Sequence, residues 1–219
     1  MRSPSKSERA AAGLGDRIKR IRQSKRWTLE RLSEASGLSI SALSKIENDQ
    51  VSTSFDTLVK IAHGLGLPAA ELFESPDPTG GQQADGPRVY SARRVFTRRG
   101  QGEPFSSDYY DYEVHSSELT HKGMIPLVMT INAREAPPRA DWSVHDGEEF
   151  IYVVSGELVL HTALYAPLTL RAGDSAYIDS TMAHAFVSLS KDAAVMLSVC
   201  MTEQLRFNDQ IVGMSLATG

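Results

Sequence analysis

The sequence predicts a two-domain protein, in which a small all-α domain precedes a larger all-β domain. Apolar residues recur at helical spacing before residue 75. After residue 105, short runs rich in Val, Ile, Tyr and Thr alternate with clusters of Gly, Pro, Asp and Ser, as strands and turns do. Between them, residues 75–87 hold three Pro, three Gly and no large apolar residue, which is typical of a linker. The expected divisions are a flexible N-terminus at 1–12, a helical domain at 13–74, a linker at 75–90 and a β domain at 91–219.

Composition limits the class of protein. The 219 residues are 41% hydrophobic and 23% charged, which is ordinary for a chain that buries a core. No stretch approaches the roughly 18 apolar residues of a membrane span, and the first residues lack the apolar segment of a secretory signal. Cys200 is the single cysteine, so an internal disulfide is excluded, and its apolar strand suggests a buried packing role. We expect a soluble cytoplasmic protein without a membrane partner.

Charge is distributed unevenly along the chain. Residues 1–75 hold 12 Lys and Arg against 9 Asp and Glu, whereas residues 76–219 hold 11 against 18. A basic first part on an acidic remainder points to a polyanionic partner for the first part. Ordinary variation among solvated charges explains this balance equally well.

Two short helices separated by a glycine turn are predicted near residue 37. Thr28 can cap the first helix, Gly37 can take the left-handed conformation that ends it, and Ser39 can cap the second. This is the helix-turn-helix pattern of DNA-binding proteins. Burial of the apolar positions leaves four side chains of the second helix exposed toward a major groove, namely Ser41, Ala42, Ser44 and Lys45.

Residues 14–73 resemble the Cro/C1-type (XRE family) DNA-binding domain. The landmarks are Leu14–Gly15, Arg22, Thr28–Leu29, Ser36–Gly37–Leu38, Leu43–Ser44–Lys45–Ile46–Glu47 and Leu58…Ile61–Ala62…Leu65–Gly66. The resemblance implies a five-helix domain in which Thr28 contacts phosphate and Ser39, Ser41, Ala42, Ser44 and Lys45 face the groove. No Arg, Asn or Gln is available there for bidentate base contacts, so Arg26 and Lys45 are expected to add phosphate affinity. The alternative to DNA binding is that the domain keeps this fold only for packing or dimer contacts.

A candidate metal site lies in the β domain. His145 precedes Glu149 by four residues across a turn, and His184 comes before a later strand. Two imidazoles and one carboxylate can bind Fe, Zn, Mn or Ni as a divalent ion. Judged by spacing alone, these three residues could equally be ordinary polar residues at the ends of strands.

Residues 143–157 and 173–188 resemble the two signature motifs of the cupin superfamily, with Gly156, Gly173–Asp174 and His184 at the expected places. The resemblance implies a jelly-roll β-barrel whose pocket is lined by His145, Glu149 and His184. Ser143 replaces the first histidine of the usual pair, and Pro137 stands where a glycine is usual. An organic ligand on a metal-free triad is therefore the alternative. Further residues expected to line an effector pocket are Ser143, Tyr112, Tyr152, Tyr177 and Phe186.

Together the domains resemble bacterial XRE-cupin regulators. That resemblance implies a non-enzymatic transcriptional regulator that binds a double-stranded DNA operator and a small-molecule effector as a homodimer or higher homo-oligomer. The alternative is a non-haem iron enzyme like hydroxypropylphosphonate epoxidases, with which this chain shares the His/Glu triad and a Tyr-Tyr-x-Tyr segment at residues 109–112. A DNA-binding protein whose barrel only dimerises is a third interpretation. No catalytic residue is predicted, because the first domain keeps the complete DNA-binding pattern, which an enzyme would not need.

Overall fold

The computed structural model describes residues 13–73, 94–120 and 122–201. The predicted N-terminal segment 1–12 and linker 75–90 lie outside these ranges. Within residues 13–73 there are four α-helices rather than the five expected, because the last segment winds as a short 3₁₀ helix just after Pro68. The elements are α2 (Leu14–Ser24), α3 (Leu29–Ser36), α4 (Ile40–Glu47), α5 (Phe55–Leu65) and η1 (Ala69–Phe73).

The predicted caps of the helix-turn-helix are confirmed. The Thr28 side chain accepts a hydrogen bond from the Arg31 N–H at 3.3 Å, at the start of α3. Gly37 ends that helix with a φ of 72°, a conformation that costs glycine little. The Ser39 hydroxyl then accepts from the Ala42 N–H at 3.1 Å and begins α4. The turn between the two helices is therefore determined by local sequence.

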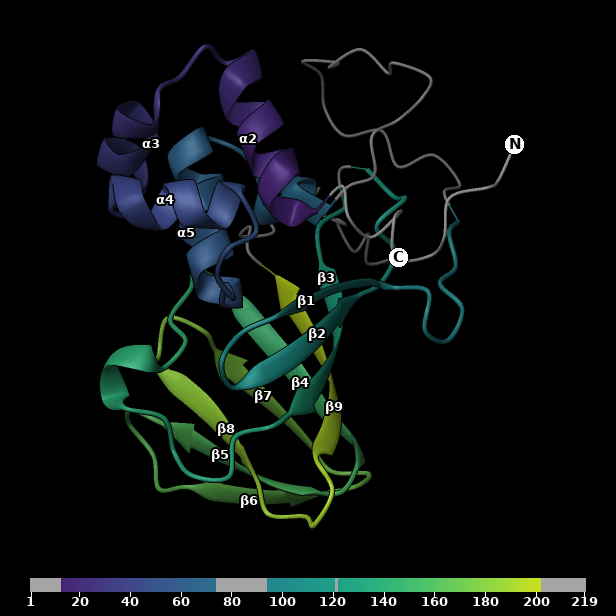
Figure 1. Ribbon diagram of the computed structural model, residues 1–219. Helices are drawn as coiled ribbons and strands as arrows, with labels where there is room; N and C mark the ends of the chain where they lie inside the picture. Colours follow the sequence, from purple (N-terminus) through teal and green to yellow (C-terminus); the bar gives the residue numbers. More distant parts are fainter. Residues whose placement is uncertain (1–12, 74–93, 121, 202–219) are drawn as a thin grey trace, which may run out of the picture.

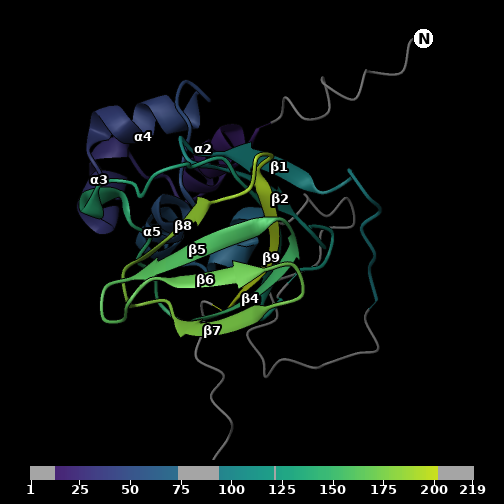
Figure 2. The same ribbon diagram turned by 90° about the horizontal axis from the view of Figure 1, so that it is seen from below.

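The β-rich part consists of two antiparallel sheets (Figure 1). The larger has the order β1-β2-β3-β9-β4-β7 and the smaller the order β6-β5-β8, seen from below in Figure 2. Among the described residues these strands do not close into one hydrogen-bonded barrel, which corrects the barrel expectation. A short 3₁₀ helix, η2 (Arg139–Asp141), precedes β4. The strands are β1 (Glu103–Ser106), β2 (Tyr110–Val114), β3 (Ile125–Ile131), β4 (Glu148–Ser155), β5 (Glu157–Thr162), β6 (Leu168–Arg171), β7 (Ser175–Asp179), β8 (His184–Ser188) and β9 (Ala194–Met201).

Alternation along the strands decides which side chains enter the core. In β4, Glu149, Ile151 and Val153 are buried, while Phe150 and Tyr152 on the opposite face are exposed. The buried apolar residues of the sheets and of the helices form one continuous cluster. No helix within the described ranges is long and apolar enough to cross a membrane.

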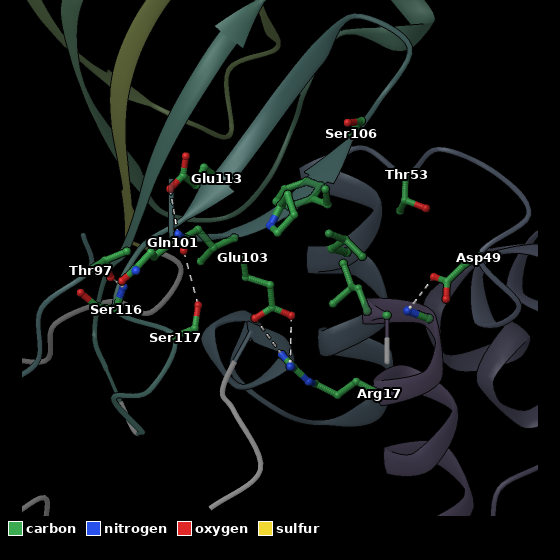
Figure 3. A pocket seen from close by; sticks show the side chains of 18 of the residues that line it. Arg17, Asp49, Thr53, Thr97, Gln101, Glu103, Ser106, Glu113, Ser116 and Ser117 are labelled. Atoms are coloured by element: carbon green, nitrogen blue, oxygen red, sulfur yellow. Dashed lines mark hydrogen bonds and ion pairs between the residues drawn. The ribbon is translucent and has the colours of Figure 1, made fainter. Parts of the chain in front are cut away.

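The helical and β-rich parts meet directly. The Arg17 guanidinium on α2 forms an ion pair with Glu103 of β1, with 3.1 Å between Nη2 and Oε1. The Thr53 N–H, in the loop before α5, donates to the Ser106 carbonyl oxygen at 3.0 Å. The Arg17–Glu103 pair lies in a cleft of about 1290 Å³ that both parts line (Figure 3).

Candidate functional site

The predicted DNA-contacting residues lie on the surface of the helix-turn-helix. Arg26, Thr28, Ser39, Ser41 and Lys45 are exposed. Ala42 and Ser44 of α4 are half-buried. The opposite face of α4 packs into the core with Leu43 and Ile46. Ser39, Ser41 and Lys45 are therefore exposed at the cap and along the solvent-facing side of α4.

A buried ion pair fixes α4 against α2. The Arg22 guanidinium donates to both carboxylate oxygens of Glu47, at 2.6 and 2.7 Å, and a third donor reaches the Trp27 carbonyl oxygen at 2.7 Å. The Glu47 carboxylate raises the pKa of Arg22. Such a bidentate pair sets geometry as well as charge. Arg22 and Glu47 are both landmarks of the family pattern in the sequence, but that pattern does not indicate that they pair.

In the β-rich part, the three predicted metal ligands converge. His145 lies in the loop before β4, Glu149 is in β4, and His184 begins β8. The Nε2 atoms of His145 and His184 lie 3.7 and 3.3 Å from Oε2 of Glu149. All three side chains are almost completely buried. The fold thus brings His184 next to His145 and Glu149, although it comes about forty positions later in the sequence.

Both imidazoles are oriented by backbone carbonyl groups. Nδ1 of His184 lies 2.9 Å from the Met182 carbonyl oxygen, and Nδ1 of His145 lies 3.3 Å from that of Asp146. An Nδ1 proton directed at a carbonyl leaves Nε2 facing Glu149, the arrangement that metal-binding histidines commonly have. Imidazole nitrogens and carboxylate oxygens are donors that divalent cations take in proteins, and the described residues whose donor atoms come close enough together to hold one are His145, Glu149 and Cys200.

The electrostatics of the cluster favour a charged carboxylate. Burial by itself raises the pKa of Glu149, but the facing imidazoles of His145 and His184 outweigh this effect and hold the pKa well below its usual range. Burial lowers the pKa of His184, and the Glu149 carboxylate reverses this effect to leave it raised. A metal cation beside the carboxylate would balance its buried charge.

Two residues of β9 extend this cluster beyond the prediction. The Ser198 hydroxyl donates to Oε1 of Glu149 at 2.6 Å and lies 3.3 Å from Sγ of Cys200. The ligand atoms of His145, Glu149 and Cys200 all lie within 4.8 Å of one another. Cys200 is buried as expected, but it adjoins the cluster as well as filling space. The sequence carried a signal, because alternation in β9 places Ser198 and Cys200 on the same face.

The residues predicted to line an effector pocket divide into two groups. Phe186 and Tyr112 are buried, and the Phe186 ring lies edge-to-face against His184 with centroids 5.9 Å apart. Ser143 forms an isolated backbone bridge with His184. Tyr152 and Tyr177, in contrast, are 41% and 62% exposed on the opposite side of their strands, so the structure does not bring them to the cluster.

One aromatic side chain of the helical part reaches this cluster. Phe55, the first residue of α5, lies edge-to-face against His145 with ring centroids 5.2 Å apart. Phe55 is 4% exposed. Sequence analysis missed this contact, because it depends on how the two parts of the molecule pack together.

A capped helix-turn-helix with a polar recognition surface, joined to a β-rich part with a buried His/Glu cluster, defines the class of DNA-binding regulators with a cupin domain. The Helix-turn-helix family matches residues 18–72 and the Cupin domain family matches residues 127–200. The HTH-type transcriptional regulator PuuR of Escherichia coli (strain K12) is 30% identical over 188 residues, covering 84% of this chain and 92% of the relative. The chain therefore belongs to the family of HTH-type transcriptional regulators that carry a cupin domain.

Other relatives agree with this family. The HTH-type transcriptional regulator SutR of Escherichia coli (strain K12) is 31% identical over 136 residues, covering 58% of this chain and 73% of the relative. The crystal structure of an HTH_3 family transcriptional regulator from Vibrio cholerae has a TM-score of 0.54 at 18% identity, covering 87% of this chain and 96% of the other, which supports the fold. The curated relatives are regulators, which favours the non-enzymatic interpretation over the iron-enzyme alternative.

Proposed function

We propose that this regulator binds a DNA operator through α4 and that occupancy of its cupin cluster changes operator affinity. One observation carries the proposal: a single chain joins an exposed polar recognition helix to a buried cluster of His145, Glu149 and His184. The first feature suits DNA, and the second suits a divalent metal or a small molecule. A regulator that binds operator DNA is proposed to act in the cytoplasm.

The DNA contact is proposed to depend strongly on phosphates. Thr28, Arg26 and Lys45 are exposed and can contact the backbone of the duplex. Four small side chains, Ser39, Ser41, Ala42 and Ser44, can lie against base edges without bidentate contacts. This combination predicts marked salt dependence together with moderate sequence readout.

Operator binding is proposed to involve a homodimer, so that two copies of α4 reach half-sites about one helical turn apart. The outer face of the larger sheet supports this assembly. Phe150, Tyr152 and Val154 are exposed on β4, and Tyr177 lies opposite Phe150 in the register of β7. An exposed apolar face of this kind is typical of a protein–protein contact. Tyr152 and Tyr177 are then proposed interface residues instead of pocket residues.

The cluster is proposed to bind Fe, Zn, Mn or Ni as a divalent ion through His145, Glu149 and His184. A bound cation would supply Lewis acidity and positive charge at the Glu149 carboxylate. The residues of the chain orient the ligands and exclude water, because the cluster is buried and both imidazoles are held by backbone carbonyl groups. The Phe186 ring, which packs against His184, provides an apolar surface beside the cluster on which a small-molecule effector can also pack.

Operator capture tests the proposal. Purified full-length protein is mixed with fragmented genomic DNA and the bound fragments are sequenced, with Lys45→Ala in parallel. Lys60→Ala is the matched control, because Lys60 is an exposed lysine on α5 and is not among the predicted DNA-contacting residues. We expect a small set of palindromic fragments that Lys45→Ala loses and Lys60→Ala retains. Binding without sequence preference, or equal loss in both variants, would contradict the proposal.

A further inference from the structure

Two direct contacts, and a third path through Phe73, attach the start of α5 to the β-rich part. The Phe55 ring meets the His145 ring, and the backbone N–H of Thr53 donates to Ser106. Phe55 also stacks on Phe73, with centroids 6.2 Å apart, and Phe73 stacks on Phe105 of β1 at 5.7 Å. Of these, only the first touches a side chain of the His/Glu cluster.

At its other end, α5 is packed closely against the helix-turn-helix. A Cβ on Gly64 would lie 2.9–3.0 Å from atoms of Ser36, so the two helices approach almost as closely as atoms allow. Leu58, Ile61 and Leu65 of α5 are completely buried in the same core as Leu32 of α3. Close packing of this kind transmits a displacement instead of absorbing it. A movement at Phe55 would therefore move α3, and with it α4.

We propose that Phe55 couples the cupin cluster to operator binding, as the residue through which the DNA-binding domain senses the orientation of His145. This inference rests on the proposed function. Without metal, the His145 ring is held at Nδ1 alone, by a contact of 3.3 Å, and a cation on Nε2 would add a second attachment that fixes the plane of the ring. An edge-to-face contact is sensitive to that plane. Metal binding therefore favours one position of α5 over others, and this difference in affinity between two states is the physical requirement for coupling. Phe55 is a positioning residue and binds neither metal nor DNA.

The test measures coupling in full-length protein. Dissociation constants are measured for a captured operator fragment, with chelator and with Zn²⁺ as the probe, and their ratio is the coupling factor. We expect a wild-type factor of about 5 to 150, the usual range of allosteric coupling. In Phe55→Leu, Zn²⁺ affinity and metal-free operator affinity stay within about threefold of wild type, while the factor falls close to one. Weaker operator binding with an unchanged coupling factor would be a structural effect. A coupling factor that falls to one identifies loss of coupling.

Phe73→Leu is the matched control, because it also removes a buried ring from the contact between the two parts. It should keep the wild-type factor. A wild-type factor in Phe55→Leu, or an equal loss in both variants, overturns the inference. A factor of one in the wild-type protein also overturns it but leaves operator recognition intact, whereas failure to bind any specific fragment contradicts the proposed function itself.

A measurement on unaltered protein covers the case in which Phe55→Leu does not fold. Hydrogen exchange of the backbone amides in the first two turns of α5 is followed before and after addition of Zn²⁺. We expect slower exchange on metal binding, because the ring that contacts Phe55 becomes fixed. Unchanged exchange in these turns, with Zn²⁺ bound, overturns the inference.

Discussion

Two buried glutamates of this protein, one in each part, have very different surroundings. Glu47 and Glu149 have side chains that are only 2% and 3% exposed. Glu47 receives two short hydrogen bonds from one arginine, at 2.6 and 2.7 Å. Glu149 faces two imidazole nitrogens at the longer distances of 3.3 and 3.7 Å. Burial is equal, but only the first carboxylate is fully enclosed by its own cationic partner.

This difference separates a structural ion pair from a candidate binding site. A buried charge must be compensated, and at Glu47 the chain supplies a permanent cation through Arg22. At Glu149 the partners are histidines, which change charge near neutral pH and bind metals when neutral. We therefore propose that the arrangement around Glu149 can accept a metal cation, whereas that around Glu47, which is already paired with arginine, cannot. The following predictions test whether the two glutamates really differ in this way.

The largest effect is expected for Glu47→Ala. Removing the carboxylate leaves the Arg22 guanidinium buried without its partner, which costs about 3–5 kcal/mol of the free energy of unfolding. Urea unfolding of the metal-free protein, monitored by circular dichroism, measures this. Glu34→Ala, at an exposed position of α3, is the control and should stay within about 0.5 kcal/mol of wild type. A small effect at Glu47 would show that the buried pair contributes little to stability.

The second prediction concerns Glu149→Gln. We expect metal affinity to fall by more than about 100-fold, because even residues that only orient a ligand commonly affect it by 10- to 100-fold. Titration with Zn²⁺ by isothermal calorimetry measures the loss. Stability of the metal-free protein should change less than in Glu47→Ala, since the glutamine oxygen can still accept the Ser198 hydroxyl. Unchanged metal affinity, or a stability loss as large as that of Glu47→Ala, would assign Glu149 a structural role.

Local features of both parts could be predicted from the sequence. The caps at Thr28 and Ser39 follow from side chains that bond to amides three residues later, so that the sequence contains all the information they need. The His/Glu cluster was predicted from a family pattern, since its members come from the loop before β4, from β4 itself and from the distant strand β8. Alternation could have improved the pocket prediction, because Tyr152 is three residues from the inward Glu149 and must face the other side.

Features that depend on packing between distant segments could not be predicted. The contact of Phe55 with His145 arises from the position of α5 relative to β4, which no local pattern encodes. The pairing of Arg22 with Glu47 needs the angle between α2 and α4, and Cys200 reaches the cluster only through the register that sets it opposite Glu149. The expectation of a fifth α-helix was also wrong, because residues 69–73, just after Pro68, wind as the 3₁₀ helix η1.

The smallest effect is expected at the surface of the helix-turn-helix, for Ser39→Ala. The Ser39 hydroxyl accepts the Ala42 N–H at the start of α4, and loss of such a cap costs about 1 kcal/mol. Ser41→Ala is the matched control, because Ser41 is exposed two positions further along the same helix and has no capping role. Thermal unfolding should therefore separate the two variants, although both lose one hydroxyl from the proposed DNA surface. If they unfold alike, the cap contributes no stability, and Ser39 then matters at this surface only through DNA contact. If Ser39→Ala alone is destabilised, part of any loss in operator affinity reflects fraying of α4, and Ser41→Ala gives the cleaner measure of base contact.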